Sequence, residues 1–274
     1  KVRIVNMWKR KGFVTAMTGD GVNDAPSIKA ADIGVGMGIT GTEVSKGVSD
    51  IILADDSFST IVTAVKEGRR IFDNIRNVLV YLLTGNIAEI LVVFIGTLCG
   101  MEIFLPIQLL YINLITDSIP AIALAFESSE KNIMHKKSPK NNGSFFTPFL
   151  IAKISLSALL KTIAITLVYF INIKLYNKEV ATTMAFLALI LLEVIFAYSC
   201  RNLKKNIINK NLFSNKYMNK SIFALGIIQI IIFITPLKSI FNIVDLKLFQ
   251  VIYCFVVVIL LFLTDELSKN IIIK

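Results

Sequence analysis

The chain has 274 residues, of which 55% are hydrophobic, and its mean hydropathy is +0.70. This composition excludes an ordinary soluble domain, which is less apolar. The formal net charge of +10 would suit a nucleic-acid partner, but the lysines fall in loops between apolar blocks, as in membrane proteins. We therefore expect a lipid bilayer, and no nucleic acid, as the partner of this chain.

Charged and apolar residues are unevenly distributed along the chain. Residues 1–76 are mixed and charged, whereas the rest alternates apolar blocks with short polar loops. This pattern predicts a small α/β domain followed by an all-α transmembrane bundle. We expect the soluble domain over 1–58, a stalk helix over 59–76 and the membrane domain over 77–274.

The N-terminal segment predicts a strand that ends in a polar turn. Residues 13–18 form an apolar run typical of a buried strand, and the glycines on both sides of Asp20 predict a sharp turn. Asp20 would then lie at the carboxyl end of the strand, where open α/β sheets bind ligands. Asn23 and Asp24 follow on the same turn, and Pro26 suits the first turn of a helix that reaches Ala31.

The next elements continue the same alternation. We expect a second strand over 32–37, a short helix over 43–48 and a third strand over 50–54. Short strands that alternate with helices predict a parallel sheet.

The polar turn has two interpretations. Two neighbouring carboxylates and an amide, from Asp20, Asp24 and Asn23, can hold Mg²⁺ together with a phosphate oxygen. A nearby ammonium group, for which Lys1 is a candidate, would neutralise phosphoryl charge. The five residues 20–24 taken alone also fit a simple turn, because Gly, Asn and Asp all favour turns.

One long helix is predicted from about Ser57 to Leu98. Only Gly68 and Gly85 break its apolar spacing, and three arginines precede the first apolar block. Such a helix would join the soluble domain to the membrane, either as a rigid coupling rod or as a simple anchor.

Six apolar stretches are long enough to cross a bilayer, which takes roughly 20 residues. Pro236 and Lys238 interrupt the end of the fifth. The expected spans are 77–99, 106–126, 149–171, 181–200, 221–241 and 247–264.

The basic residues predict the orientation of these spans. Two loops, 127–148 and 200–220, hold most of the lysines and would face the cytoplasm. That orientation also puts residues 1–76 in the cytoplasm. The lysines and the arginine behind this prediction are Lys131, Lys136, Lys137, Lys140, Arg201, Lys204, Lys205, Lys210, Lys216 and Lys220.

Polar residues inside the spans are costly and usually functional. Asn86 and Glu89 share one face of the first span, and Asn113, Thr116 and Asp117 share one face of the second. Together with Glu193 in the fourth span they offer only oxygen ligands, which calcium prefers. Pro120 should loosen the second span near Thr116, because it cannot donate a backbone hydrogen bond. The candidate ion ligands are Asn86, Glu89, Asn113, Thr116, Asp117 and Glu193.

A second interpretation is that these groups hold the helices together by hydrogen bonds. It accounts poorly for three buried carboxylates, since we expect no matching cluster of buried basic residues. Lys161, in the middle of the third span, is the exception, and either extends to the interface or pairs with a carboxylate.

Several runs resemble P-type cation-transporting ATPases. Residues 15–26 (TAMTGDGVNDAP) resemble the hinge signature of that family, and 27–35 and 50–58 are similar too. Residues 86–89 (NIAE) and 113–120 (NLITDSIP) are similar to the fifth and sixth membrane helices of its calcium-pump branch. Sodium pumps typically have Asp at the position of Asn113, so the resemblance favours calcium.

The resemblance implies specific roles. It implies a haloacid-dehalogenase-like phosphorylation domain in which Asp20 and Asp24 serve Mg²⁺ and Lys1 contacts phosphate. It implies that Glu193 corresponds to a carboxylate of the eighth membrane helix. ATP would be the substrate, Mg²⁺ the cofactor and Ca²⁺ the transported ion, in an integral protein of a bacterial plasma membrane.

Other parts that the family uses do not occur in these 274 residues. The Asp-Lys-Thr-Gly run that contains the phosphorylated aspartate and the Thr-Gly-Glu loop are both missing from the sequence. We therefore expect a C-terminal portion that needs the N-terminal half of the pump as a partner and is inactive alone.

Three alternatives remain open. The first is a pump for manganese or another divalent ion, because manganese also accepts oxygen ligands. The second is a membrane-tethered phosphatase of the haloacid dehalogenase type, which would not need buried carboxylates. The third is a non-catalytic truncated copy that acts as an accessory subunit.

Overall fold

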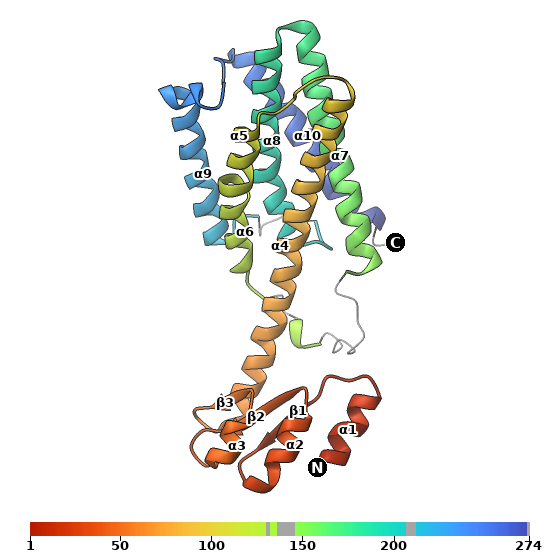
Figure 1. Cartoon of the computed structure of the whole chain (residues 1–274), viewed down its shortest axis with the longest axis vertical. Coiled ribbons are helices and arrows are strands. Elements are labelled where there is room, and N and C mark those ends of the chain that lie inside the picture. Colours follow the sequence, from red (N-terminus) through yellow and green to blue (C-terminus); the bar gives the residue numbers. More distant parts are fainter. Residues whose placement is uncertain (130–131, 136–145, 207–211, 273–274) are drawn as a thin grey trace. The chain divides into compact units, whose positions relative to one another are not determined.

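The structure is a computed structural model that describes residues 1–129, 132–135, 146–206 and 212–272 (Figure 1). It divides into two compact units, one of residues 1–72 with 129–145 and one of residues 73–128 with 146–274. Part of the orientation argument falls outside the described residues, so the orientation stays a prediction. The lysines concerned are Lys131, Lys136, Lys137, Lys140 and Lys210.

The N-terminal unit contains the predicted parallel sheet. Its strands β1 (Ala16–Gly19), β2 (Ile33–Met37) and β3 (Ile51–Leu53) pair in parallel in the order β1-β2-β3. The prediction that a buried strand begins at Phe13 was wrong, because β1 begins at Ala16 and both Phe13 and Val14 are exposed. Phe13 instead packs edge-on against Trp8 of helix α1 (Val2–Arg10), with 5.4 Å between ring centroids.

Two short helices cover this sheet close to where they were predicted. Helix α2 (Ala25–Ala30) has proline in its first turn, and α3 (Glu43–Gly47) is capped by the Thr42 hydroxyl, which accepts from the Ser45 backbone N–H at 3.3 Å. A Cβ atom on Gly34 of β2 would lie 2.6 Å from Ile28 Cγ2, so glycine lets α2 approach the sheet closely.

Asp56 fixes the loop that follows β2. Its carboxylate accepts hydrogen bonds from the backbone N–H groups of Gly38, Ile39 and Thr40 at 2.6, 3.0 and 2.7 Å, and from the Thr40 hydroxyl at 2.8 Å. Asp56 has a φ of 50°, a left-handed conformation that Asp and Asn adopt more easily than most residues. Burial would raise the pKa of Asp56, but these hydrogen bonds outweigh it and lower the pKa from 3.8 to about 2.

We expect Asp56→Asn to loosen this loop. Asparagine keeps the backbone conformation but loses the negative charge that accepts these bonds. Because the folded-state pKa lies below the unfolded value, the wild-type contribution is present above about pH 4 and is lost as the pH falls toward 2. A protease at neutral pH should therefore cleave the full chain near residues 38–42 faster in Asp56→Asn than in the wild type. The control is Glu43→Gln, an exposed residue of α3, which should be cleaved at the wild-type rate.

The second unit is helical. Six segments are long and apolar enough to cross a membrane among the residues that the structure describes. Their helices are α4 (Phe58–Leu98), α5 (Pro106–Tyr111) with α6 (Ser118–Ala125), α7 (Pro148–Leu175), α8 (Lys178–Cys200), α9 (Lys216–Ile234) and α10 (Leu248–Ile272). The prediction of a single long helix up to Leu98 is confirmed by α4, which has 41 residues.

Two predicted helix boundaries were wrong. Helix α9 covers Lys216–Ile234 rather than 221–241, because the residue before a proline disfavours helical backbone and a short 3₁₀ helix begins at Pro236. Helix α10 continues to Ile272 rather than ending at 264, because Asp265 and Lys269 near its end have buried partners.

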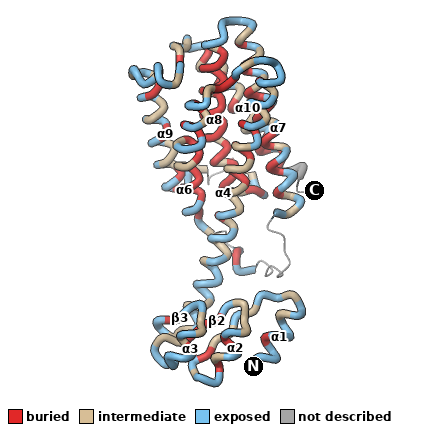
Figure 2. Tube along the Cα trace, viewed as in Figure 1, coloured by how far each residue is buried: buried red, intermediate tan, exposed pale blue. Residues whose placement is uncertain are grey.

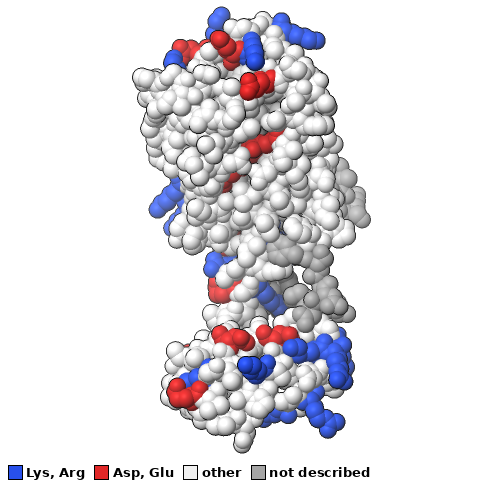
Figure 3. All heavy atoms as spheres, in the orientation of Figure 1, with Lys and Arg blue, Asp and Glu red and all other residues white. Residues whose placement is uncertain are grey.

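Helix α8 forms the centre of the helical unit, and its residues are mostly buried (Figure 2). It packs against α7 and α10, while α6 packs against α9. On the face seen in Figure 3, Lys and Arg lie toward the ends of this unit, and the wide region between is nearly free of charge apart from a few acidic atoms. An uncharged belt of this kind suits contact with lipid.

The second span is not a regular α-helix. Between α5 and α6 the chain forms a π-helical turn, Ile112–Thr116, and the Asp117 N–H donates to the Ile112 carbonyl at 2.9 Å. This irregularity was predicted from Pro120, which cannot donate to the carbonyl of Thr116. The turn ends directly before Asp117 and so determines where that carboxylate lies.

Candidate ion-binding and phosphate sites

Glu89 of α4 and Asn113 of the π-helical turn lie together. The Asn113 side-chain amide donates to Glu89 Oε2 at 2.7 Å and to the Leu109 carbonyl at 3.0 Å. Glu89 is buried, whereas Asn113 is exposed and Asn86 is half-buried. The structure therefore brings two of the six predicted ligands into direct contact.

Asp117 is buried beside α4. The Tyr81 hydroxyl donates to Asp117 Oδ1 at a long 3.4 Å, and Thr116 next to it is fully buried. Asp117 also interacts electrostatically with Glu89 and Glu193, so the predicted carboxylates lie in one region.

Four oxygen atoms in this region have no hydrogen-bond partner within the described part of the chain. Buried polar atoms are normally paired, so each calls for an explanation. The atoms are Thr84 Oγ1, Glu89 Oε1, Thr116 Oγ1 and Asp117 Oδ2. Oxygen atoms of this kind are the ligands that a hard cation such as calcium takes.

Glu193 of α8 is in a different situation. Both of its carboxylate oxygens accept from Lys161 Nζ of α7 at 2.8 Å, and both side chains are almost completely buried. Of the two alternatives for Lys161, pairing with a carboxylate is therefore confirmed. The expectation that no other buried basic residues accompany the carboxylates was wrong, because Lys153 and Lys269 are also buried. Among the described residues, no three His, Cys, Asp or Glu side chains lie close enough together to hold a metal ion.

The residues predicted to form a phosphate site lie at the carboxyl end of β1. Lys1 Nζ contacts Asp24 Oδ1 at 2.5 Å, and this hydrogen bond lowers the pKa of Asp24 below 3.8. Asp20 and Asn23 are exposed. A Cβ atom on Gly19 would lie 2.5 Å from the Asp24 Cβ, so only glycine lets the strand end this close to Asp24.

The backbone of the same loop is held by α3. The Asp20 carbonyl accepts from the Ser45 hydroxyl at 2.9 Å and from the Thr42 N–H at 2.8 Å. Asp20 itself is exposed, whereas Asp24, four residues later, is buried. Two carboxylates of this kind fit Mg²⁺, which keeps several waters and usually binds through one or two of them.

Sequence reasoning missed a buried polar network between α7, α8 and α10. Lys153 Nζ donates to Asp265 Oδ1 at 2.7 Å, and the hydroxyls of Ser157 and Ser199 donate to the same carboxylate at 2.5 and 2.7 Å. Lys269 pairs with Glu266 one turn further. The available signal was a lysine inside an apolar block. Its partner could not be inferred, because Asp265 is 112 residues away from Lys153 and 108 away from Ser157.

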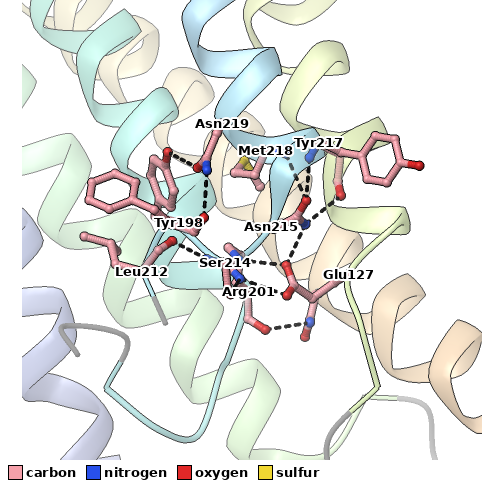
Figure 4. A network of polar contacts seen from close by, with 12 residues as sticks. Glu127, Tyr198, Arg201, Leu212, Ser214, Asn215, Tyr217, Met218 and Asn219 are labelled. Atoms are coloured by element: carbon pink, nitrogen blue, oxygen red, sulfur yellow. Dashed lines mark hydrogen bonds and ion pairs between the residues drawn. The ribbon is translucent and has the colours of Figure 1, made fainter. Parts of the chain in front are cut away.

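A second missed network joins the ends of α6 and α8 to the start of α9 (Figure 4). Arg201 binds both oxygens of Glu127, with Nε–Oε2 at 2.7 Å and Nη2–Oε1 at 2.9 Å. The Asn215 amide donates to Glu127 Oε2 at 2.7 Å, and its oxygen caps α9 through the N–H groups of Tyr217 and Met218. Arg201 was predicted only as a charge in a cytoplasmic loop, yet it is buried.

Comparison with known proteins gives a consistent result. The family model described as "Cation transporting ATPase, C-terminus" matches residues 101–271. The calcium-transporting ATPase of Bacillus subtilis is 40% identical over 247 residues, which are 88% of this chain and 28% of that protein. Calcium-transporting ATPase 1 of Yarrowia lipolytica is 36% identical over 273 residues, 98% of this chain and 29% of that protein.

A plant relative matches a shorter part more closely. Calcium-transporting ATPase 4, endoplasmic reticulum-type, of Arabidopsis thaliana is 49% identical over 152 residues, which are 55% of this chain and 14% of that protein. The chain thus spans less than a third of the length of these relatives. Since the family model covers more than half of the residues, the chain belongs to the cation-transporting ATPases and carries their C-terminal region.

Proposed function

We propose that this chain forms the C-terminal part of an ATP-driven, calcium-transporting P-type ATPase. The observation that carries the proposal is the set of four unpaired buried oxygens on α4 and around the π-helical turn, two of them from Glu89 and Asp117. Buried oxygens without partners are costly unless something binds them. Calcium is a suitable cation for such oxygen ligands, and the relatives are named as calcium-transporting ATPases.

The N-terminal unit would then be part of a haloacid-dehalogenase-like phosphorylation domain. Its parallel sheet and the position of Asp20 and Asp24 at the carboxyl end of β1 support this role. In the proposal, Asp20 and Asp24 hold Mg²⁺, which neutralises phosphate charge when bound. Lys1, already beside Asp24, supplies a positive charge toward phosphoryl oxygens.

Helix α4 would link the two activities in this proposal. It begins at Phe58, shortly after β3, and includes Glu89. An unbroken helix transmits rotation and translation along its length, so phosphorylation and ion binding could affect each other through it. We place residues 1–76 in the cytoplasm, because ATP-dependent phosphorylation takes place there, and the protein in a bacterial plasma membrane.

The test is calcium-dependent phosphorylation of the full-length protein that contains this chain. We expect acid-stable phosphorylation from labelled ATP to require micromolar calcium in the wild type. Glu89→Gln and Asp117→Asn should each raise the calcium concentration needed for phosphorylation by more than about a hundredfold. Loss of a direct ligand should lower the affinity at least as much as loss of an outer-shell residue.

The matched control is Glu102→Gln, an exposed carboxylate in the loop after α4. It should phosphorylate as the wild type does. Normal calcium dependence in both Glu89→Gln and Asp117→Asn would contradict the proposal. Activation by manganese at concentrations at which calcium has no effect would replace calcium by manganese as the transported ion.

A further inference from the structure

The ion pair between Lys161 and Glu193 is almost completely buried. The single ammonium group donates to both carboxylate oxygens at 2.8 Å, and it also lies 4.0 Å from the ring centroid of Phe196, a cation–π contact. The exposed fractions of the two side chains are 2% and 0%. The ammonium is therefore held by a carboxylate and an aromatic face, both contributed by α8.

The other side of the Glu193 carboxylate faces α4. A Cβ atom on Gly85 would lie 3.2 Å from each Glu193 oxygen. Glycine thus lets the backbone of α4 approach the carboxylate so closely that even a methyl group would be crowded. A calcium ion with its six to eight oxygen ligands would have to displace the ammonium in order to reach Glu193.

We infer that the ammonium group of Lys161 takes the place of a transported cation at Glu193, so that the membrane unit binds a single calcium ion at Glu89, Asp117 and their neighbours. This inference rests on the calcium transport proposed above. It makes Lys161 a residue that determines how many ions are bound, and it removes Glu193 from the set of predicted ligands.

The unpaired oxygens support this division. Glu89 and Asp117 each have one oxygen without a partner among the described residues, whereas both oxygens of Glu193 are bonded.

The number of bound ions is the direct test. Radioactive calcium bound at equilibrium is measured on the full-length protein in detergent and divided by the number of phosphorylation sites. We expect a ratio of about one in the wild type, because the Lys161 ammonium already binds both oxygens of Glu193 and leaves them no free position for an ion. A ratio of two would overturn the inference, and this measurement does not depend on any variant that fails to fold.

The variant Lys161→Met/Glu193→Gln removes both charges and leaves no buried charge unpaired. We expect it to bind the same number of ions with an affinity within about threefold of the wild type, because neither residue touches calcium. Loss of calcium binding in a variant that still elutes as a folded protein would overturn the inference.

Glu89→Gln separates this inference from the proposed function. If Glu89→Gln loses calcium and Lys161→Met/Glu193→Gln keeps it, both hold. If both variants lose calcium, the inference fails and the proposed function remains. If Glu89→Gln and Asp117→Asn both bind calcium like the wild type, the proposed function fails first.

Discussion

Replacing Lys153 with methionine will lower the free energy of unfolding of the helical unit by about 3–5 kcal/mol, the usual cost of leaving one partner of a buried ion pair alone. Lys153 is fully buried in α7 and its ammonium contacts Asp265 Oδ1 at 2.7 Å. Methionine fills similar space but leaves the Asp265 carboxylate with only the hydroxyls of Ser157 and Ser199 as side-chain donors in the described structure. At about 2–4 °C per kcal/mol, the unfolding temperature should fall by about 6–20 °C.

The measurement is thermal unfolding of the chain in mild detergent, with Lys174→Met as the control. Lys174 lies on the same helix but is exposed in its last turn, so its loss should cost no more than about 1 kcal/mol. Lys153→Met/Asp265→Asn should recover about half or more of the lost stability, because it leaves no unpaired charge at this position. Wild-type stability in Lys153→Met would show that the buried pair contributes nothing.

Replacing Arg201 with methionine will open the junction between α6, α8 and α9. Arg201 holds Glu127 through two parallel hydrogen bonds and also donates to the Ser214 hydroxyl at 2.7 Å. Removing it leaves the buried Glu127 carboxylate without its guanidinium partner, at a cost of about 3 kcal/mol or more. If opening is local, amide exchange there should accelerate by about a hundredfold, since 1.4 kcal/mol is tenfold.

Hydrogen–deuterium exchange over residues 123–127 and 212–219 reports this opening. Arg201→Lys should give an intermediate effect, because lysine keeps the charge but cannot form the two-pronged contact. Lys205→Met, an exposed neighbour, should exchange at the wild-type rate. Unchanged exchange in Arg201→Met would mean that the network does not hold these helix ends together.

The arrangement of the elements was largely predictable from sequence. The alternation of short apolar runs with helical ones predicted the parallel sheet, and the lack of strong breakers up to Leu98 predicted α4. Both patterns are local, so neighbouring residues are enough to show them. Phe13 was misplaced because its contact with Trp8, rather than its apolar character, determines where it lies.

The pairing of charges was not predictable in the same way. Lys161 and Glu193 are 32 residues apart and Lys153 and Asp265 are 112 apart. A sequence shows that such residues lie in apolar blocks, but only the packing of α7 against α8 and α10 determines which charges meet. For that reason Glu193 seemed as available for an ion as Glu89.

The π-helical turn gives the second span a capacity that a regular helix lacks. An α-helix advances 1.5 Å and turns about 100° per residue, and a π-turn contains one residue more than an α-turn. If Ile112–Thr116 tightened into an α-helical turn, everything from Asp117 onward would rotate by about 100° relative to α5. A change of one hydrogen-bond register would then swing the Asp117 carboxylate from one helix face to another without unfolding either α5 or α6.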